Sequence, residues 1–87
     1  MHFGETLSLV MTEKGMKAKE LSDRCGVTAP YISQLVNGKL KDPTFTKAVA
    51  IINGLDMTVS EFIEIQDASD RKSAAEIMSR IMSGRNE

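Results

Sequence analysis

The chain has 87 residues, of which 41% are hydrophobic, 26% charged and 5% aromatic, and its formal net charge is −1. This length allows one small domain, and the composition is that of a folded globular chain and not of a disordered one. A single cysteine, Cys25, excludes an internal disulfide and a cysteine-rich zinc site. The sequence has no apolar run that could span a bilayer and no signal-peptide pattern, so we expect a cytoplasmic protein with no membrane partner.

Charge is distributed unevenly along the chain. Residues 1–47 contain seven Lys or Arg against five Asp or Glu, a net charge of +2, whereas residues 48–87 contain four against seven, a net charge of −3. Binding to phosphates requires a positive face and not a high total charge. The first half of the chain can therefore carry a nucleic-acid surface although the whole chain is slightly acidic.

The stretch 18–36 predicts two short helices joined by a tight turn. Gly26, between them, can adopt the positive φ that a sharp turn needs, and Val27 is an apolar residue that can close the corner. On either side, apolar residues recur at helical spacing, namely Leu21 and Cys25 in the first helix and Ile32 and Leu35 in the second.

The second of these helices, residues 29–36, is expected to have Thr28 as its N-cap. Pro30 in the first turn has no N–H, so the Thr28 hydroxyl should accept a hydrogen bond from the amide of Tyr31. The helix should end at the Asn37-Gly38 pair, because both residue types accept left-handed geometry.

Apolar residues at helical spacing predict three further helices, over residues 3–14, 45–53 and 59–65. Gly15 should end the first of them, and the second should follow a cap at Thr44 and stop at Gly54. No strand pattern is present, so the sequence predicts an all-α fold of five compact helices. Phe3, Leu7, Val10 and Met11 share one face of the first helix. Phe45, Ala48, Val49 and Ile52 should face inward from the second, and Val59, Phe62, Ile63 and Ile65 carry the apolar spacing of the third.

The last part of the chain is predicted to be a linker followed by one short helix. Residues 66–72 are polar and charged, and Ser73 with Glu76 fits a capping box. We therefore divide the chain into a domain over residues 1–66 and a linker with a helix over residues 67–87. An apolar stripe on this helix consists of Ile77, Met78, Ile81 and Met82.

A short helix of about three turns is marginal alone, so this stripe must pack against something. The candidates are a second copy of the chain, the helix's own domain, and a foreign protein. Dimerisation is our first hypothesis for it.

The two-helix stretch resembles the helix-turn-helix of lambdoid phage repressors and Cro proteins, the Cro/repressor-type family. The resemblance extends without gaps over residues 3–65. It implies a lambda-repressor-like DNA-binding domain, to which the C-terminal helix is an addition, and it implies double-stranded DNA as the partner. The matching residues are Leu21, Ser22, Cys25, Gly26, Val27, Ile32 and Leu35, followed by Asn37, Gly38, Lys39 and Pro43.

The family places its third helix in the DNA major groove. Carried over by position, base readout falls to Ala29, Pro30, Tyr31, Ser33 and Gln34. Gln34 is the strongest candidate, because its amide can pair with adenine through two hydrogen bonds. Contacts with the DNA backbone are implied for Lys17, Lys19, Thr28, Asn37, Lys39, Lys41 and Thr44.

The leading hypothesis is a sequence-specific transcriptional regulator, a repressor of phage, plasmid or mobile-element type that binds a two-fold operator as a homodimer. The alternative is an antitoxin-like or other interaction module whose C-terminal helix binds a protein partner, and the two roles can coexist. Enzyme activity, a cofactor and a metal site are not expected, since the chain has one His and one Cys and no phosphate-binding glycine loop. Cys25 is expected to be a buried small hydrophobe, and His2 to lie in a frayed terminus.

Overall fold

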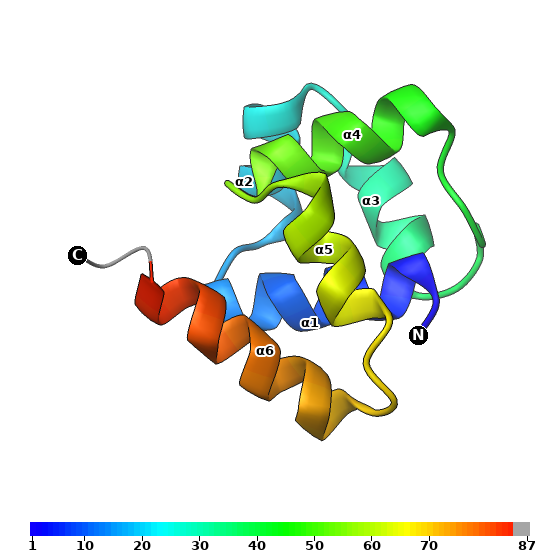
Figure 1. Cartoon of the computed structure of the whole chain (residues 1–87). Helices are drawn as coiled ribbons and strands as arrows, with labels where there is room; N and C mark the ends of the chain where they lie inside the picture. Colours follow the sequence, from blue (N-terminus) through cyan, green and yellow to red (C-terminus); the bar gives the residue numbers. More distant parts are fainter. Residues whose placement is uncertain (85–87) are drawn as a thin grey trace.

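The computed structural model describes residues 1–84, and every regular element within this range is an α-helix (Figure 1). This confirms the predicted all-α fold, and the bounds of the first and third helices are as predicted. The last three residues of the predicted segment 67–87 lie outside the described range. The helices are α1 (Phe3–Lys14), α2 (Ala18–Cys25), α3 (Ala29–Val36), α4 (Phe45–Gly54), α5 (Val59–Gln66) and α6 (Arg71–Gly84).

Helix α1 is the centre of the packing. It contacts α3, α5 and α6, while α2 packs against α3 and α4. The rings of Phe3 and Phe62, whose centroids are 4.9 Å apart, join α1 to α5. All six helices contribute to one core, whose fully buried apolar side chains include Leu7, Val10, Leu21, Ile32, Leu35, Ile51, Phe62, Ile65 and Met78.

The turn between α2 and α3 forms as predicted. Gly26 adopts φ 75°, a left-handed conformation in which most side chains are strained, and its N–H donates to the carbonyl oxygen of Ser22 at 2.9 Å. Val27 is buried at the corner. Thr28 Oγ1 accepts a hydrogen bond from the amide of Tyr31 at 3.3 Å. Turn and cap together fix where α3 begins relative to α2.

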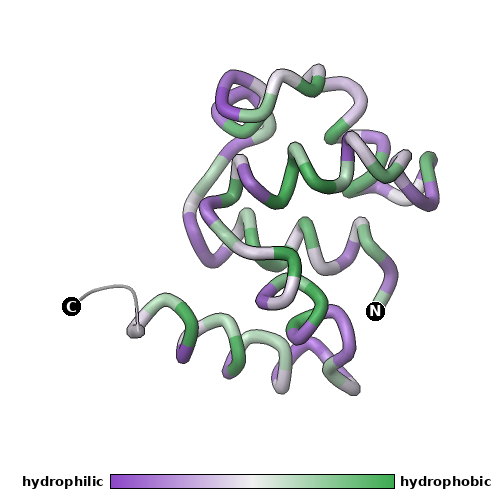
Figure 2. The backbone as a smooth tube through the Cα atoms, turned by 45° about the horizontal axis from the view of Figure 1, so that its top comes forward, coloured by the Kyte–Doolittle hydropathy of each residue, from purple (hydrophilic) through white to green (hydrophobic). Residues whose placement is uncertain are grey.

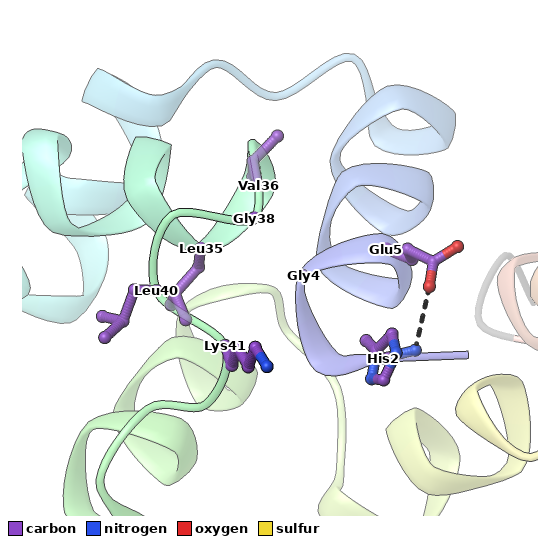
Figure 3. A pocket seen from close by; sticks show the side chains of 8 residues that line it. All are labelled: His2, Gly4, Glu5, Leu35, Val36, Gly38, Leu40 and Lys41. Carbon is purple, nitrogen blue, oxygen red and sulfur yellow. Dashed lines mark hydrogen bonds between the residues drawn. The ribbon is translucent and has the colours of Figure 1, made fainter.

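Helices α1 and α3 approach each other closely at Gly4. A Cβ atom at this position would overlap the backbone carbonyl oxygen of Leu35, in the last turn of α3 (Figure 3). A backbone atom cannot move aside without shifting the whole helix. The missing side chain of Gly4 therefore allows α1 to lie directly against the end of α3.

Phe45, which was predicted to face inward, is exposed, and so are two apolar residues of α5. The exposed fraction is 83% for Phe45, 41% for Val59 and 48% for Ile63. Helical spacing groups each of them with core residues, but spacing does not tell how far the neighbouring helices extend. The helices packed against α4 leave its first turn uncovered, and those packed against α5 cover Phe62 and Ile65 only.

The end of α4 also differs from the prediction. Gly54 does not stop the helix but is its last residue, and a Cβ there would lie 2.9 Å from Cβ of Cys25 and 3.0 Å from Cδ1 of Leu21. The left-handed residue is Asp56, with φ 59°. Close packing on α2 thus explains the glycine. Cys25 is half-buried at this contact, not fully buried as expected.

Helix α6 begins earlier than predicted. Asp70 is its cap, since Oδ1 of Asp70 accepts a hydrogen bond from the amide of Ser73 at 2.8 Å. Ser73 therefore lies inside the first turn, and the predicted capping box with Glu76 is wrong. Aspartate caps a helix as well as serine does, and the earlier start shortens the connection after α5 to residues 67–70.

The apolar stripe of α6 packs against α1 and α5, and Figure 2 shows hydrophobic residues recurring along this helix. Met78 is fully buried, as is Ala74 before it, so the prediction that Met78 serves a dimer interface is wrong. The remaining residues of the stripe, Ile77, Ile81 and Met82, are half-buried on the same core. The stripe was predicted to pack against a second copy, its own domain or a foreign protein, and at its centre it packs against its own domain.

Replacing Gly4 by alanine should destabilise the protein. Alanine is normally favoured over glycine in a helix, but here its methyl group would press on the carbonyl of Leu35, and overpacking of this kind lowers the free energy of unfolding by about 1–3 kcal/mol. Denaturant titration should show a lower midpoint. The control is Gly84→Ala, where an added methyl meets no atom within 4 Å. If both variants unfold at the wild-type midpoint, the close approach is absent in solution.

The cap of α6 should depend on pH. Hydrogen bonds from the amide of Ser73, and next from its hydroxyl, hold the pKa of the Asp70 carboxyl below its ordinary value of 3.8. Because the pKa is lower in the folded state, this contribution to stability is complete above the ordinary value and is lost as the pH falls through the lowered one.

Asp70→Asn should retain the cap without this pH dependence, and Asp70→Ala should lose the cap at every pH. Thermal midpoints measured from pH 2 to pH 6 would test this, through the difference between wild type and each variant. If the thermal midpoints of wild type and Asp70→Asn fall identically as the pH is lowered, the loss of stability in acid comes from other carboxylates.

Candidate nucleic-acid interface

The buried side of α3 determines which of its residues face outward. Ile32 and Leu35 are fully buried, and at 3.6 residues per turn the opposite side carries Pro30, Ser33 and Gln34. All three are exposed. Three of the five residues predicted for base readout therefore share one free surface, as the side chains of a recognition helix must.

The other two residues predicted for base readout, Ala29 and Tyr31, are half-buried at the edges of this surface. Nζ of Lys47 lies over the ring of Tyr31, 4.5 Å from its centroid, which is within the range of a cation–π contact. The contact joins the first turns of α3 and α4. Lys47 is not among the site residues predicted from the sequence, and no local pattern indicates it, because Lys47 and Tyr31 lie on different helices.

The segment after α3 presents two lysines to solvent. Oδ1 of Asn37 accepts a hydrogen bond from the amide of Lys39 at 3.3 Å. Asn37 and Gly38 were both expected to accept left-handed geometry, but only Gly38 adopts it, with φ 82°. Lys39 and Lys41 are both exposed, as a contact with a phosphate requires.

The lysines around α3 form none of the ion pairs found within residues 1–84. In the described part of the chain, ion pairs join Glu20 to Arg24 and Glu64 to Arg80, each with an N–O distance of 3.8 Å. Neither pair involves a lysine. The exposed lysines beside the helix-turn-helix are Lys17 and Lys19 at the start of α2, Lys39 and Lys41 after α3, and Lys47 in α4.

Two threonines predicted to contact the DNA backbone differ in their hydrogen bonds. Thr28 caps α3 through its oxygen and can still donate its hydroxyl proton. Thr44 precedes α4, but its side chain makes no capping hydrogen bond, contrary to the prediction. Both are exposed, so both hydroxyls can reach an external acceptor.

A hollow of about 240 Å³ lies between the start of α1 and the segment after α3 (Figure 3). Leu35, Val36 and Leu40 give it a largely apolar lining, and at its polar side the amide of His2 donates to Oε1 of Glu5 at 3.2 Å. Among residues 1–84, no group of three or more His, Cys, Asp or Glu side chains could hold a metal ion.

No helix within residues 1–84 combines the length and the apolar character that a membrane crossing needs.

The family model for the helix-turn-helix matches residues 7–62, which is more than half of the chain and runs from α1 into α5. The matched range contains α2, the turn at Gly26 and α3, whereas α6 lies outside it. No curated protein and no solved structure matches the chain. The chain belongs to the Cro/C1-type helix-turn-helix family, a family of DNA-binding transcription regulators.

Proposed function

We propose that the protein is a sequence-specific repressor, of phage, plasmid or mobile-element type, that acts in the cytoplasm by binding a two-fold operator as a homodimer. The observation that best supports sequence-specific binding is the free outer face of α3, on which Pro30, Ser33 and Gln34 are exposed. The amide of Gln34 both donates and accepts, so it can bond to N6 and N7 of one adenine. A regulator of this size acts most simply by occupying the operator and excluding other proteins from it.

Contacts with the DNA backbone would come from both sides of α3. Lys17 and Lys19 lie at the start of α2, and Lys39 and Lys41 follow α3. Their contacts with phosphates would position the domain without reading sequence. Thr28, Asn37 and Thr44 could add neutral hydrogen bonds to the same backbone.

The dimer part of the proposal is supported by α5. Val59 and Ile63 are exposed and lie one turn apart, beside the buried Phe62, so the apolar side of α5 is wider than its own domain covers. A second copy related by a two-fold axis would cover this strip on both subunits and would place two α3 helices about 34 Å apart on the DNA.

A protein partner bound through α6 is the second candidate. Met78, at the centre of the α6 stripe, is buried in the core of its own domain. A partner bound through α6 would therefore have to contact the half-buried Ile77, Ile81 and Met82. The exposed strip on α5 makes the homodimer the better supported proposal.

The first test is titration of the protein onto its own upstream DNA and onto an unrelated duplex of equal length, at two salt concentrations. We expect tighter binding to the upstream DNA.

Gln34→Ala should reduce the difference in binding free energy between the two duplexes by about 1–3 kcal/mol. Lys39→Ala should weaken both alike and lower the slope of log K against log salt by about one. Equal affinity of the wild type for both duplexes would contradict an operator in the upstream DNA, and an unchanged slope for Lys39→Ala would contradict this docking.

Ile63→Asp should separate the dimer, because it would bury an unpaired charge in an apolar interface. Light scattering should give the wild type about twice the 9.6 kDa mass of one chain, and the variant the mass of one chain. Ile81→Asp makes the same change on α6. A dimer that survives Ile63→Asp but separates with Ile81→Asp would return the interface to the stripe that the sequence suggested.

A further inference from the structure

A second hollow, of about 270 Å³, lies between the α2–α3 turn and the first turns of α3 and α4. Its polar lining consists of Thr28 and Tyr31 on the α3 side and Thr46 and Lys47 on the α4 side, and none of its lining residues is acidic. Hydroxyl and ammonium groups are hydrogen-bond donors. The rest of the lining, from Gly26, Val27 and Ala50, is apolar, so these four side chains are the groups to which an anion with several acceptor oxygens could bond.

The side chain of Lys47 is held at this hollow by an attraction that leaves its charge available. Nζ lies 4.5 Å from the ring centroid of Tyr31, and the ring face attracts the cation without neutralising it. Neither ion pair found within residues 1–84 involves Lys47. The ammonium group is also exposed to water, which an anion can replace. A positive charge is thus positioned before any ligand arrives.

The hollow adjoins the outer face of α3. Tyr31 precedes Gln34 by three residues, so their side chains are neighbours on the helix surface. Thr28 Oγ1 accepts a hydrogen bond from the amide of Tyr31 at 3.3 Å and keeps its own proton for another acceptor. A sugar-phosphate strand borders the major groove on each side, so if Gln34 lies in the groove, groups beside it on α3 face one of these strands.

We propose that this hollow binds one phosphate of the DNA backbone, with the ammonium group of Lys47 as the main contact and the hydroxyls of Tyr31, Thr28 and Thr46 as further donors. The inference rests on the proposed function, because it requires α3 in the groove. It moves Tyr31 from base readout to backbone binding and adds Lys47 to the interface. Such a contact strengthens binding to every sequence alike.

The test is the affinity of Lys47→Gln for the upstream and the unrelated duplex over a series of salt concentrations. Each phosphate contact contributes about 0.9 to the slope of log K against log salt, so the variant should lose about one unit of slope and bind both duplexes about fivefold more weakly at roughly 0.15 M salt. Lys47→Arg keeps the charge and the contact with the ring, and should bind as the wild type does.

The matched control is Lys72→Gln, which removes one positive charge from an exposed lysine in the first turn of α6, away from α3. It should leave the slope unchanged. Tyr31→Phe keeps the ring under Lys47 and removes only the hydroxyl, so it should weaken both duplexes by the same factor. A loss confined to the upstream duplex would overturn the backbone assignment and return Tyr31 to base readout.

A thermal midpoint for each variant separates binding from folding. If Lys47→Gln lowers the midpoint but keeps the wild-type slope, the cation–π contact is only structural; the phosphate site is then refuted while DNA binding by α3 stands. If the wild type itself binds neither duplex in a salt-dependent manner, the proposed function and this site are both refuted.

Discussion

The orientation of α3 depends on two fully buried side chains, Ile32 and Leu35, which hold one side of the helix in the core. The turn at Gly26 sets where the helix begins, and the bare backbone of Gly4 lets α1 press against its end. An eight-residue helix is marginal by itself, so these tertiary contacts, and not helix propensity, keep α3 folded. The same packing leaves the opposite side free. The surface carrying Gln34 is therefore a consequence of the core.

Features with local causes could be predicted from the sequence. The bounds of α1 and α3 follow from apolar spacing, and the cap at Thr28 follows from residue types within one turn. The errors concern features that depend on neighbours in space. Phe45 and Ile63 have the spacing of core residues, but whether a face is covered depends on where other helices end. At α6, two good caps lie close together in the sequence, and Asp70 prevails because it extends the helix by a further turn.

The candidate site divides in the same way. The exposure of Pro30, Ser33 and Gln34 follows from the helical period once the inner face of α3 is recognised. The contact between Lys47 and Tyr31 could not be predicted, because it joins two helices across a loop and neither side chain has a distinctive local pattern. The exposed face of α3 that carries Gln34 can thus be predicted from the sequence. The lysine that lies beside this face, Lys47, is identified only from the three-dimensional structure.

The positions of the acidic residues are compatible with a positive surface around α3 on a chain with a net charge of −1. Five acidic residues of the second half lie in α5 and in the connections on either side of it, namely Asp56, Glu61, Glu64, Asp67 and Asp70. Glu64 forms an ion pair with Arg80 of α6. Helix α6 contacts α1 and α5 but not α3, and α1 lies between α6 and α3 (Figure 1). At physiological salt, charges beyond about 8 Å are largely screened from one another at the surface. Neither α5 nor α6 contacts α3, so the carboxylates of the second half and the lysines that flank α3 lie on different parts of the surface.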